Sequence, residues 1–320
     1  MFSVRQMKLG ATSLQVSALA LGCLNFGSRT NLHDSYRLLD QYVDAGGSFL
    51  DTANNYAFWN EGCIGGESEL LLGRWMKERG NRDQMFIATK VGAKPAYPGA
   101  GFGNMEGLGR EAIETAIDES LRRLGTDYVD LYYAHIDDAS TPLEETLEAL
   151  DELVRKGKVR AIGCSNYRLS RLKEAQFISE AGLTPYSCVQ QRYTYLRPRR
   201  EADFGVQVSA DEELIAYCRD REDLSLLAYS PLLNGAYTRK DVSIPESYGG
   251  SESLSRLQML KEVAAETGGT MNQIVLAWML QSAPAVIPVI AASSPEQLGE
   301  NLGALDIGLS RDQVDQLNQV

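Results

Sequence analysis

The sequence predicts a single-domain (β/α)8 barrel, an α/β TIM barrel, with an N-terminal β-hairpin and long loops on the C-terminal face of the barrel. The main observation is an alternation of short apolar runs with segments of helical periodicity along almost the whole chain. Continuous apolar strands joined by helices form parallel sheets covered by those helices. The alternation gives eight strand–helix units, and eight such units close into a barrel.

The expected elements follow from local signals. A hairpin is expected over residues 8–16, where short apolar ends flank a Gly/Thr/Ser turn. The first barrel strand is expected over 17–22, and the first helix over 32–45, ending at two glycines. Later strands are expected to begin near Ser48, Met85, Tyr128, Val159, Ser187, Leu224 and Ala285. Later helices are expected at 67–77, 110–124, 142–156, 169–181, 210–219, 253–267 and 271–282, and from Pro295 and Ser310.

A doubly wound open sheet is the alternative fold, and its signature is a GxGxxG loop after the first strand. The segment from Gly22 to Gly27 lacks the central glycine, so it does not carry this signature. The glycine-rich run at 99–103 follows no strand and opens no helix, and we expect a flexible loop there. Because the chain contains no linker and no repeat beyond the strand–helix unit, residues 1–320 are expected to form one domain.

Composition excludes several classes of partner. The chain is 44% apolar and 23% charged, and its net charge of −12 argues against nucleic acid or an anionic membrane as partner. No apolar run approaches the length of a membrane span. The 5 cysteines lack metal-type spacing and their odd number indicates reduced thiols, so a cytoplasmic location is expected. With only 2 histidines, no metal site is expected.

Titratable side chains end three of the expected strands. Asp51, Lys90 and His135 each terminate an apolar run, and Tyr56 follows Asp51 on a short polar loop. Each has an ordinary alternative: Asp51 as a turn or capping residue, Lys90 in a rim salt bridge, His135 as a satisfied polar group. Because parallel strands in one barrel end at the same rim, we expect the four side chains to converge there as a catalytic group.

The expected chemistry is general acid catalysis by Tyr56. A tyrosine has an ordinary pKa near ~10, and a neighbouring ammonium lowers it by about 1–3 units. Lys90 could supply that charge, and Asp51 could keep Lys90 protonated and oriented. His135 would add a hydrogen bond to the same substrate oxygen. Such a group would suit the protonation of an alkoxide that forms from a carbonyl.

Over nearly its whole length the chain resembles the aldo-keto reductase superfamily. The matching motifs are Asp51-Thr52-Ala53 with Tyr56, Thr89-Lys90, Ser120 to Tyr132, Gly157 to Gly163 with Ser165-Asn166, Tyr229-Ser230-Pro231-Leu232, and Glu296-Gln297-Leu298 with Glu300-Asn301-Leu302. The resemblance implies a nicotinamide-dependent oxidoreductase that reduces carbonyl compounds. It also implies a catalytic tetrad, which falls on the four residues named above.

The resemblance also implies a cofactor site. The nicotinamide carboxamide would be clamped by Ser165, Asn166 and Gln190, whose ordinary alternative is helix capping at the rim, and the nicotinamide ring would stack on Tyr229. The backbone that begins at Ser230 would supply amides to the pyrophosphate. The other residues expected to contact the cofactor are Gly22, Cys23, Leu232, Asn234, Gly235 and Ala292.

The segment that starts at Ser293 is typical of a helix N-terminus, with serine, a proline at the first helical position and Gln297. Such an end binds anions, and Gln297 and Asn301 share a face that would reach the adenosine end. Many aldo-keto reductases place Arg or Lys near Ser293 or Ala291 to bind the 2′-phosphate, and this chain has neither. NADP(H) is therefore expected with a modest preference, and NAD(H) remains possible.

The substrate pocket is expected to be walled by Asn25, Phe58 and Trp59 and by long loops at 92–109, 195–209 and 233–250. Arginines at 197, 199 and 200 would form a basic wall, or simply a solvated charge run. Two functional classes stay open. One is a reductase of aldehydes or ketones, including sugar-derived ones. The other is a non-catalytic regulatory subunit that has the same fold and binds the same cofactor. The sequence does not indicate an oligomeric state.

Overall fold

The computed structural model describes residues 4–97 and 99–319, and within these ranges eight parallel strands close into a barrel. Around the barrel the order is β10-β3-β4-β5-β6-β7-β8-β9, so neighbours in the sequence are neighbours in space. The strands are β3 (Ala20–Gly22), β4 (Phe49–Asp51), β5 (Phe86–Val91), β6 (Val129–Ala134), β7 (Val159–Ser165), β8 (Cys188–Arg192), β9 (Ser225–Tyr229) and β10 (Val286–Ile290). The predicted fold class is confirmed.

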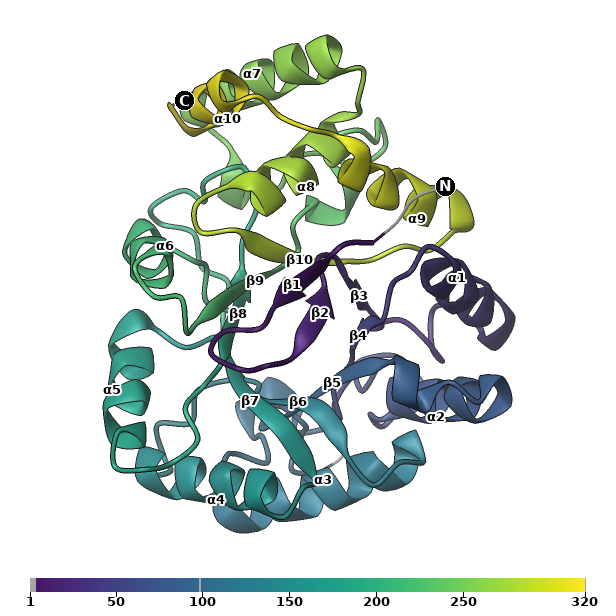
Figure 1. Cartoon of the computed structure of the whole chain (residues 1–320), viewed down its shortest axis with the longest axis vertical. Helices are drawn as coiled ribbons and strands as arrows, with labels where there is room; N and C mark the ends of the chain where they lie inside the picture. Colours follow the sequence, from purple (N-terminus) through teal and green to yellow (C-terminus); the bar gives the residue numbers. More distant parts are fainter. Residues whose placement is uncertain (1–3, 98, 320) are drawn as a thin grey trace.

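Helices surround the barrel (Figure 1). Those that follow the strands in turn are α1 (Leu32–Asp44), α2 (Glu67–Arg79), α3 (Arg110–Leu124), α4 (Leu143–Arg155), α5 (Leu169–Ser179), α6 (Glu212–Arg219), α8 (Met271–Gln281) and α9 (Pro295–Gly303). Two further helices, α7 (Ser251–Thr267) and α10 (Arg311–Gln319), contact each other outside this ring. Short 3-10 turns are η1 (Arg82–Gln84), η2 (Gly101–Gly103), η3 (Leu233–Gly235), η4 (Glu246–Tyr248) and η5 (Ala304–Asp306).

The apolar core has two parts. The larger lies between the strands and the helices, because helix stripes such as Leu38, Leu39 and Tyr42 of α1 pack on the outward faces of the strands. The smaller fills the barrel interior with inward-facing side chains such as Phe49 and Phe86, whose rings meet edge to face at 4.8 Å. Interior packing makes the barrel a rigid base for the loops at its ends.

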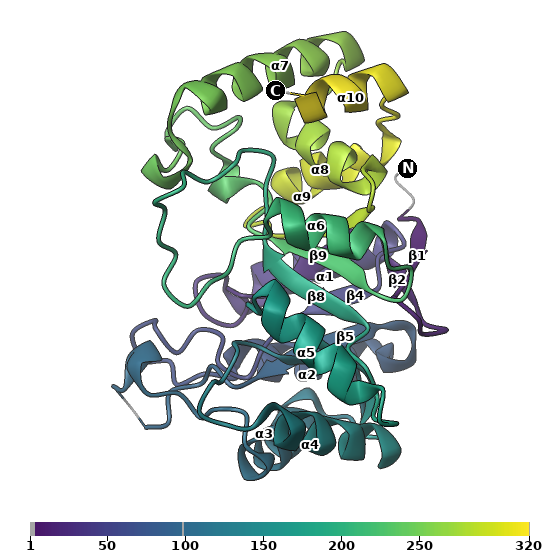
Figure 2. The same ribbon diagram turned by 90° about the vertical axis from the view of Figure 1, so that its left-hand side faces the viewer.

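An N-terminal hairpin closes the bottom of the barrel. Strands β1 (Gln6–Lys8) and β2 (Gln15–Ser17) pair antiparallel, and their connecting turn carries Leu9, which is buried in the interior cluster. The Gly10 amide donates to Ser225 Oγ at the start of β9, at 2.8 Å. Figure 2 shows the hairpin and the long loops at opposite ends of the molecule. The site must therefore be sought at the end away from the hairpin.

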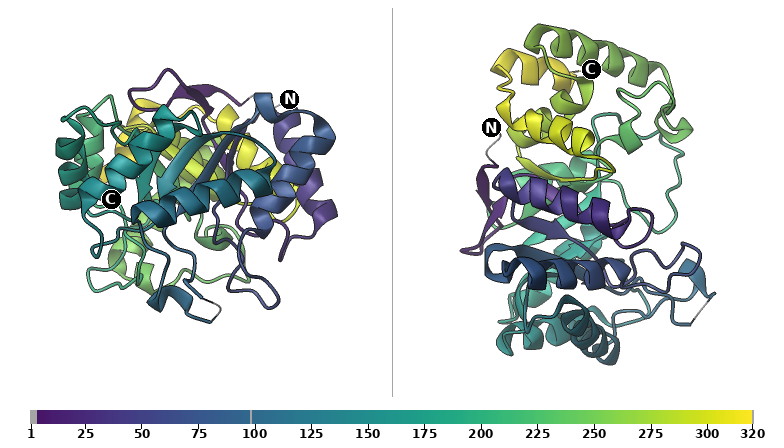
Figure 3. Two further views of the ribbon diagram at one scale, coloured as in Figure 1. Left: turned by 90° about the horizontal axis from the view of Figure 1, so that it is seen from below. Right: turned by 90° about the vertical axis from the view of Figure 1, so that its right-hand side faces the viewer.

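Several boundaries differ from expectation by one to three residues, and two of these differences have a clear cause. Ser17 belongs to the hairpin, where it pairs with Gln6, and β3 starts only at Ala20. Helix α6 starts at Glu212 because the Asp211 side chain accepts a hydrogen bond from the Leu214 amide and so acts as its N-cap. The long loops at 92–109, 195–209 and 233–250 all follow carboxyl ends of strands and project beyond the barrel on one side (Figure 3).

Among the described residues, none of the helices has the length and apolar character needed to traverse a lipid bilayer.

Candidate active site

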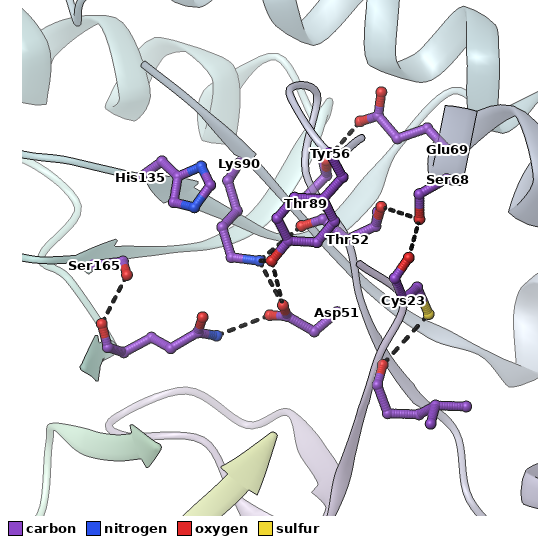
Figure 4. A network of polar contacts seen from close by, with 12 residues as sticks. Cys23, Asp51, Thr52, Tyr56, Ser68, Glu69, Thr89, Lys90, His135 and Ser165 are labelled. Atoms are coloured by element: carbon purple, nitrogen blue, oxygen red, sulfur yellow. Dashed lines mark hydrogen bonds and ion pairs between the residues drawn. The ribbon is translucent and has the colours of Figure 1, made fainter. Parts of the chain in front are cut away.

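The four predicted catalytic side chains meet at the C-terminal end of the barrel (Figure 4). Asp51 is the last residue of β4, Lys90 lies near the end of β5, and His135 directly follows β6. Because β4, β5 and β6 are adjacent parallel strands, their ends bring these side chains to one place. Tyr56 reaches the same point from the loop after β4, and its ring lies 6.0 Å from the His135 ring. The four side chains form one connected group.

Lys90 is the centre of this group. It is completely buried, and its Nζ donates to Asp51 Oδ1 at 2.5 Å, to the Thr52 carbonyl at 2.8 Å and to the Tyr56 hydroxyl at 2.7 Å. An ammonium has three protons, and here each has an acceptor. Since the Tyr56 oxygen accepts from Lys90, the tyrosine's own proton points elsewhere. Its only described acceptor, Asp51 Oδ1, is 3.4 Å away, so the hydrogen bond that this proton makes within the protein is long and weak.

The electrostatics differ from the prediction for Tyr56. Burial raises the pKa of Tyr56 well above its ordinary 10.0, and the Asp51 carboxylate raises it further. The expected lowering of this pKa by Lys90 is therefore wrong for this structure, because loss of water and the carboxylate outweigh the ammonium. Burial also lowers the pKa of Lys90, and Asp51 opposes that shift. Tyr56 stays protonated over the whole neutral range.

His135 is held in its uncharged form. Burial lowers the pKa of His135 well below 6.5, and the positive charge of Lys90 lowers it further. Its Nδ1 is buried and has no hydrogen-bond partner among the described residues. A neutral imidazole has one N–H donor, which suits it to contact an oxygen without surrendering a proton.

The three residues expected to clamp a carboxamide are bonded to one another and to the tetrad. Gln190 Nε2 donates to Asp51 Oδ2 at 2.8 Å, and the Ser165 hydroxyl donates to the Gln190 carbonyl at 2.7 Å. Asn166 Nδ2 donates to the His135 carbonyl at 2.9 Å. Asn166 Oδ1 accepts from the Tyr229 hydroxyl at 2.6 Å and from the Val208 amide at 3.0 Å. These hydrogen bonds hold Asp51 and the backbone at His135 in place beside Tyr56.

Backbone strain collects at this rim. The non-glycine residues with positive φ in the described chain are Ala57, Asn166, Ser230, Leu233 and Asn234. Ala57 follows Tyr56, Asn166 follows β7, and the others follow β9. Left-handed conformations cost free energy in residues other than glycine, and they persist where packing enforces them, which is common at functional sites. The strain thus marks the same end of the barrel as the titratable group.

A cavity of about 680 Å³ opens beside the tetrad. It has the size of a small-molecule site. Beside the tetrad it is lined by Asp51, Tyr56 and His135, but not by Lys90, which is completely buried. The predicted cofactor residues that line it are Gly22, Ser165, Asn166, Gln190, Tyr229, Ser230, Leu232, Asn234, Gly235, Ala292, Ser293, Gln297 and Asn301. The cavity runs from the tetrad across the loops after β9 and β10.

Two predicted contact residues lie outside the cavity lining. Cys23 is fully buried, and its Sγ faces the Leu21 carbonyl at 3.4 Å. Phe58 packs behind the wall, with its ring edge to face with Trp59 at 5.0 Å and with Phe102 at 5.1 Å. Asn25 and Trp59 do line the cavity. Phe58 is half-buried and contacts two residues of the lining, Trp59 and Phe102, so its place in the substrate pocket stays a prediction.

Sequence reasoning missed several lining residues. Phe102 belongs to the glycine-rich run that was expected to be a plain flexible loop, yet it forms part of η2 and stacks on Trp59 at 6.5 Å. The sequence feature that could have revealed Phe102 is a single aromatic residue within a run of glycines. Val206 and Gln207 come from the loop after β8, and Arg239 comes from the loop after β9. Nothing in the local sequence distinguishes these three from other loop residues.

The loop after β8 is not a basic wall. Arg197 pairs with Glu212 and Glu252, and Arg199 pairs with Glu201 and Glu246. These two exposed arginines are matched by carboxylates, which favours the solvated charge run for Arg197 and Arg199, whereas no ion pair is described for Arg200. The loop still forms part of the cavity wall through its uncharged residues. Within the described residues, no group of three or more His, Cys, Asp or Glu side chains gathers in a way that could hold a metal ion.

Comparison with known proteins defines the class. The model of the Aldo/keto reductase family matches residues 18–320. The uncharacterized oxidoreductase YrpG of Bacillus subtilis is 31% identical, with 98% of this chain and 94% of that protein covered. The aryl-alcohol dehydrogenase GME11368 of Pestalotiopsis microspora is 31% identical (97% and 80% covered), and the norsolorinic acid reductase stcV of Emericella nidulans is 32% identical (94% and 77%).

A solved structure agrees. The thermostable aldo-keto reductase Tm1743, determined with the inhibitor epalrestat, has a TM-score of 0.76 and 29% identity, and 98% of both chains is covered. The fold and the sequence match therefore define a family of barrel-type oxidoreductases that generally use nicotinamide cofactors. The chain belongs to the aldo/keto reductase family.

Proposed function

We propose that this protein reduces aldehydes or ketones to alcohols with a nicotinamide cofactor, and that Tyr56 is the general acid. The observation that supports this most is the direction of the Lys90–Tyr56 hydrogen bond. Because Lys90 Nζ donates to the Tyr56 oxygen at 2.7 Å, the phenolic proton is left for a substrate oxygen in the cavity. A group that directs a proton without a strong internal acceptor toward a reacting oxygen can act as a general acid.

The other residues take complementary roles. Asp51 keeps Lys90 charged through a 2.5 Å contact, and its second oxygen is held by Gln190. His135 stays neutral and can donate one hydrogen bond to the carbonyl oxygen that Tyr56 protonates. As the oxygen gains negative charge, both donors bind it more strongly, which stabilises the transition state over the ground state.

The donor set of the cavity fits a dinucleotide. Ser165, Gln190 and Tyr229 lie at the end near the tetrad, and Ser293, Gln297 and Asn301 at the end near α9. A nicotinamide cofactor bound there would supply the hydride. The residues of the loop after β9 would hold its pyrophosphate, and Tyr229 would offer a ring face to the nicotinamide. We infer a modest preference for NADP(H), with NAD(H) also accepted.

Aromatic side chains favour a flat, apolar substrate. The rings of Trp59 and Phe102 lie nearly parallel, at an angle of 27°, and their side chains are 40% and 44% exposed. The Tyr56 ring meets Trp59 edge to face at 6.5 Å, so this pair adjoins the proposed acid. Leu24, Ile136 and Val206 add apolar surface. We therefore propose aryl aldehydes and aryl ketones as the preferred class over sugar-derived carbonyls.

A direct assay tests the function. Purified protein with NADPH, and separately with NADH, is mixed with 4-nitrobenzaldehyde, an aryl ketone, an aliphatic aldehyde and a keto-sugar, and loss of the reduced nicotinamide absorbance is followed. We expect turnover with the aryl compounds, faster than with the sugar. Binding of NADPH without turnover on any compound would instead support the non-catalytic regulatory subunit.

A further inference from the structure

The N-terminal end of α9 has few free hydrogen-bond donors left to bind a phosphate. Ser294 Oγ accepts from the Gln297 amide at 3.3 Å, and the first helical residue, Pro295, has no N–H. The Ser293 amide and hydroxyl both donate to Gln297 Oε1, at 2.8 and 2.9 Å. The predicted anion site at this helix end is therefore largely satisfied by its own side chains. The loop from Ala291 to Ser294 also contains no cation.

A cation reaches this part of the cavity from another element. Arg239 lies on the loop after β9, and among the described residues that line the cavity it is the only Lys or Arg, in a protein of net charge −12. The hydroxyl of the preceding Thr238 accepts from Asn272 Nδ2 at 2.8 Å. Asn272 also donates to Glu300 of α9, at 3.3 Å. Through these two hydrogen bonds, Asn272 of α8 connects the loop that carries Arg239 with α9.

Gly235 leaves room for the Arg239 side chain. Gly235 has a φ of +87°, and a Cβ there would lie 2.8 Å from Arg239 Cδ. The Arg239 side chain thus lies against the bare backbone of Gly235, at the end of the run expected to bind the pyrophosphate. Its Nε and Nη2 donate to Asp241, at 3.1 and 2.5 Å, while Nη1 has no partner among the described residues. The two hydrogen bonds to Asp241 fix the plane of the Arg239 guanidinium and leave Nη1 available for another acceptor.

We propose that Arg239 is the phosphate-binding cation of the cofactor site, in place of the missing cation after β10. The inference rests on the proposed binding of a nicotinamide dinucleotide. Arg239 would donate through Nη1 to a phosphate oxygen, either of the 2′-phosphate or of the pyrophosphate, as arginine commonly does with phosphate. Asp241 orients the guanidinium and weakens the attraction by its opposite charge.

The test measures binding and does not depend on turnover. Protein fluorescence is titrated with NADPH and with NADH for the wild type, Arg239→Gln and the control Arg221→Gln. Arg221 makes the same type of forked pair, with Asp223 at 3.0 and 2.6 Å, but it precedes β9 and does not line the cavity. Both variants lose one positive charge, so a difference between them reports position. The variant Arg239→Lys keeps the positive charge but not the planar guanidinium. Its Kd for NADPH therefore shows how much of the affinity depends on charge alone.

We expect Arg239→Gln to raise the Kd for NADPH by ~10- to 100-fold, the usual range for a charge-assisted hydrogen bond. An unchanged Kd for NADH would assign the contact to the 2′-phosphate, and an equal rise for both would assign it to the pyrophosphate. If neither Kd rises more than in Arg221→Gln, the inference is wrong. A wild type that binds neither dinucleotide would contradict the proposed function together with this inference.

Discussion

Replacing Lys90 by methionine separates the catalytic from the structural role of the buried pair. Lys90 and Asp51 are 0% and 1% exposed, so Lys90→Met leaves a buried carboxylate whose main partner is gone. Removing one partner of a buried pair costs about 3–5 kcal/mol of folding stability. The variant also loses the 2.7 Å donor that orients the Tyr56 proton, and we expect kcat to fall by ~10²- to 10⁴-fold.

The comparison variants are Tyr56→Phe, the double variant Lys90→Met/Tyr56→Phe, and Lys90→Met/Asp51→Asn. We expect the first double variant to be little slower than either single variant, because Lys90 and Tyr56 act as a unit. The second should regain most of the lost stability in urea unfolding, since no buried charge remains unpaired, but no activity. Multiplicative losses of kcat, or a Lys90→Met protein as stable as the wild type, would refute this reasoning.

Three further outcomes are expected. As the pH rises, kcat should begin to fall before pH 10.5, because burial lowers the pKa of Lys90 below that value and Lys90 then loses its proton. Tyr56 stays protonated over this range because its own pKa is raised. A kcat that stays constant to above pH 10.5 would contradict this. Ser293→Arg should tighten NADPH binding more than NADH binding in a fluorescence titration, since it adds a charge-assisted contact, and equal changes would argue against a 2′-phosphate near Ser293. Trp59→Ala and Phe102→Ala should raise KM for an aryl aldehyde more than for an aliphatic one, and parallel changes would remove the aromatic wall from substrate recognition.

The barrel and its rim could be read from the sequence because their signals are local. Each strand is a short apolar run, and parallel strands of a barrel must end at one rim, so Asp51, Lys90 and His135 were placed together without coordinates. The hairpin was predicted from its turn residues, although Ser17 was assigned to the wrong strand. Pairing of Ser17 with Gln6 depends on a partner eleven residues away, which the local pattern does not encode.

The remainder of the site depends on contacts between distant loops. Phe102 joins the aromatic wall only because the loop after β5 folds against the loop after β4. Arg239 packs against Gly235, where a Cβ would lie 2.8 Å from its Cδ, and no local pattern marks that contact. The pKa of Tyr56 differs from the expectation for a related reason: burial and the nearby Asp51 carboxylate raise it, and the local sequence shows neither the burial nor that proximity.

The central claim is that Tyr56 delivers the proton in carbonyl reduction. The most direct measurement is a stopped-flow single turnover, in which wild-type protein and Tyr56→Phe, each saturated with NADPH, are mixed with 4-nitrobenzaldehyde and the reduced nicotinamide absorbance is followed. We predict rapid oxidation of the bound NADPH by the wild type, and a rate lower by ~10²-fold or more in Tyr56→Phe with unchanged affinity for NADPH. Loss of a general acid typically slows a reaction by ~10²-fold or more. A Tyr56→Phe variant that keeps more than about a tenth of the wild-type rate would therefore contradict the claim that Tyr56 is the acid.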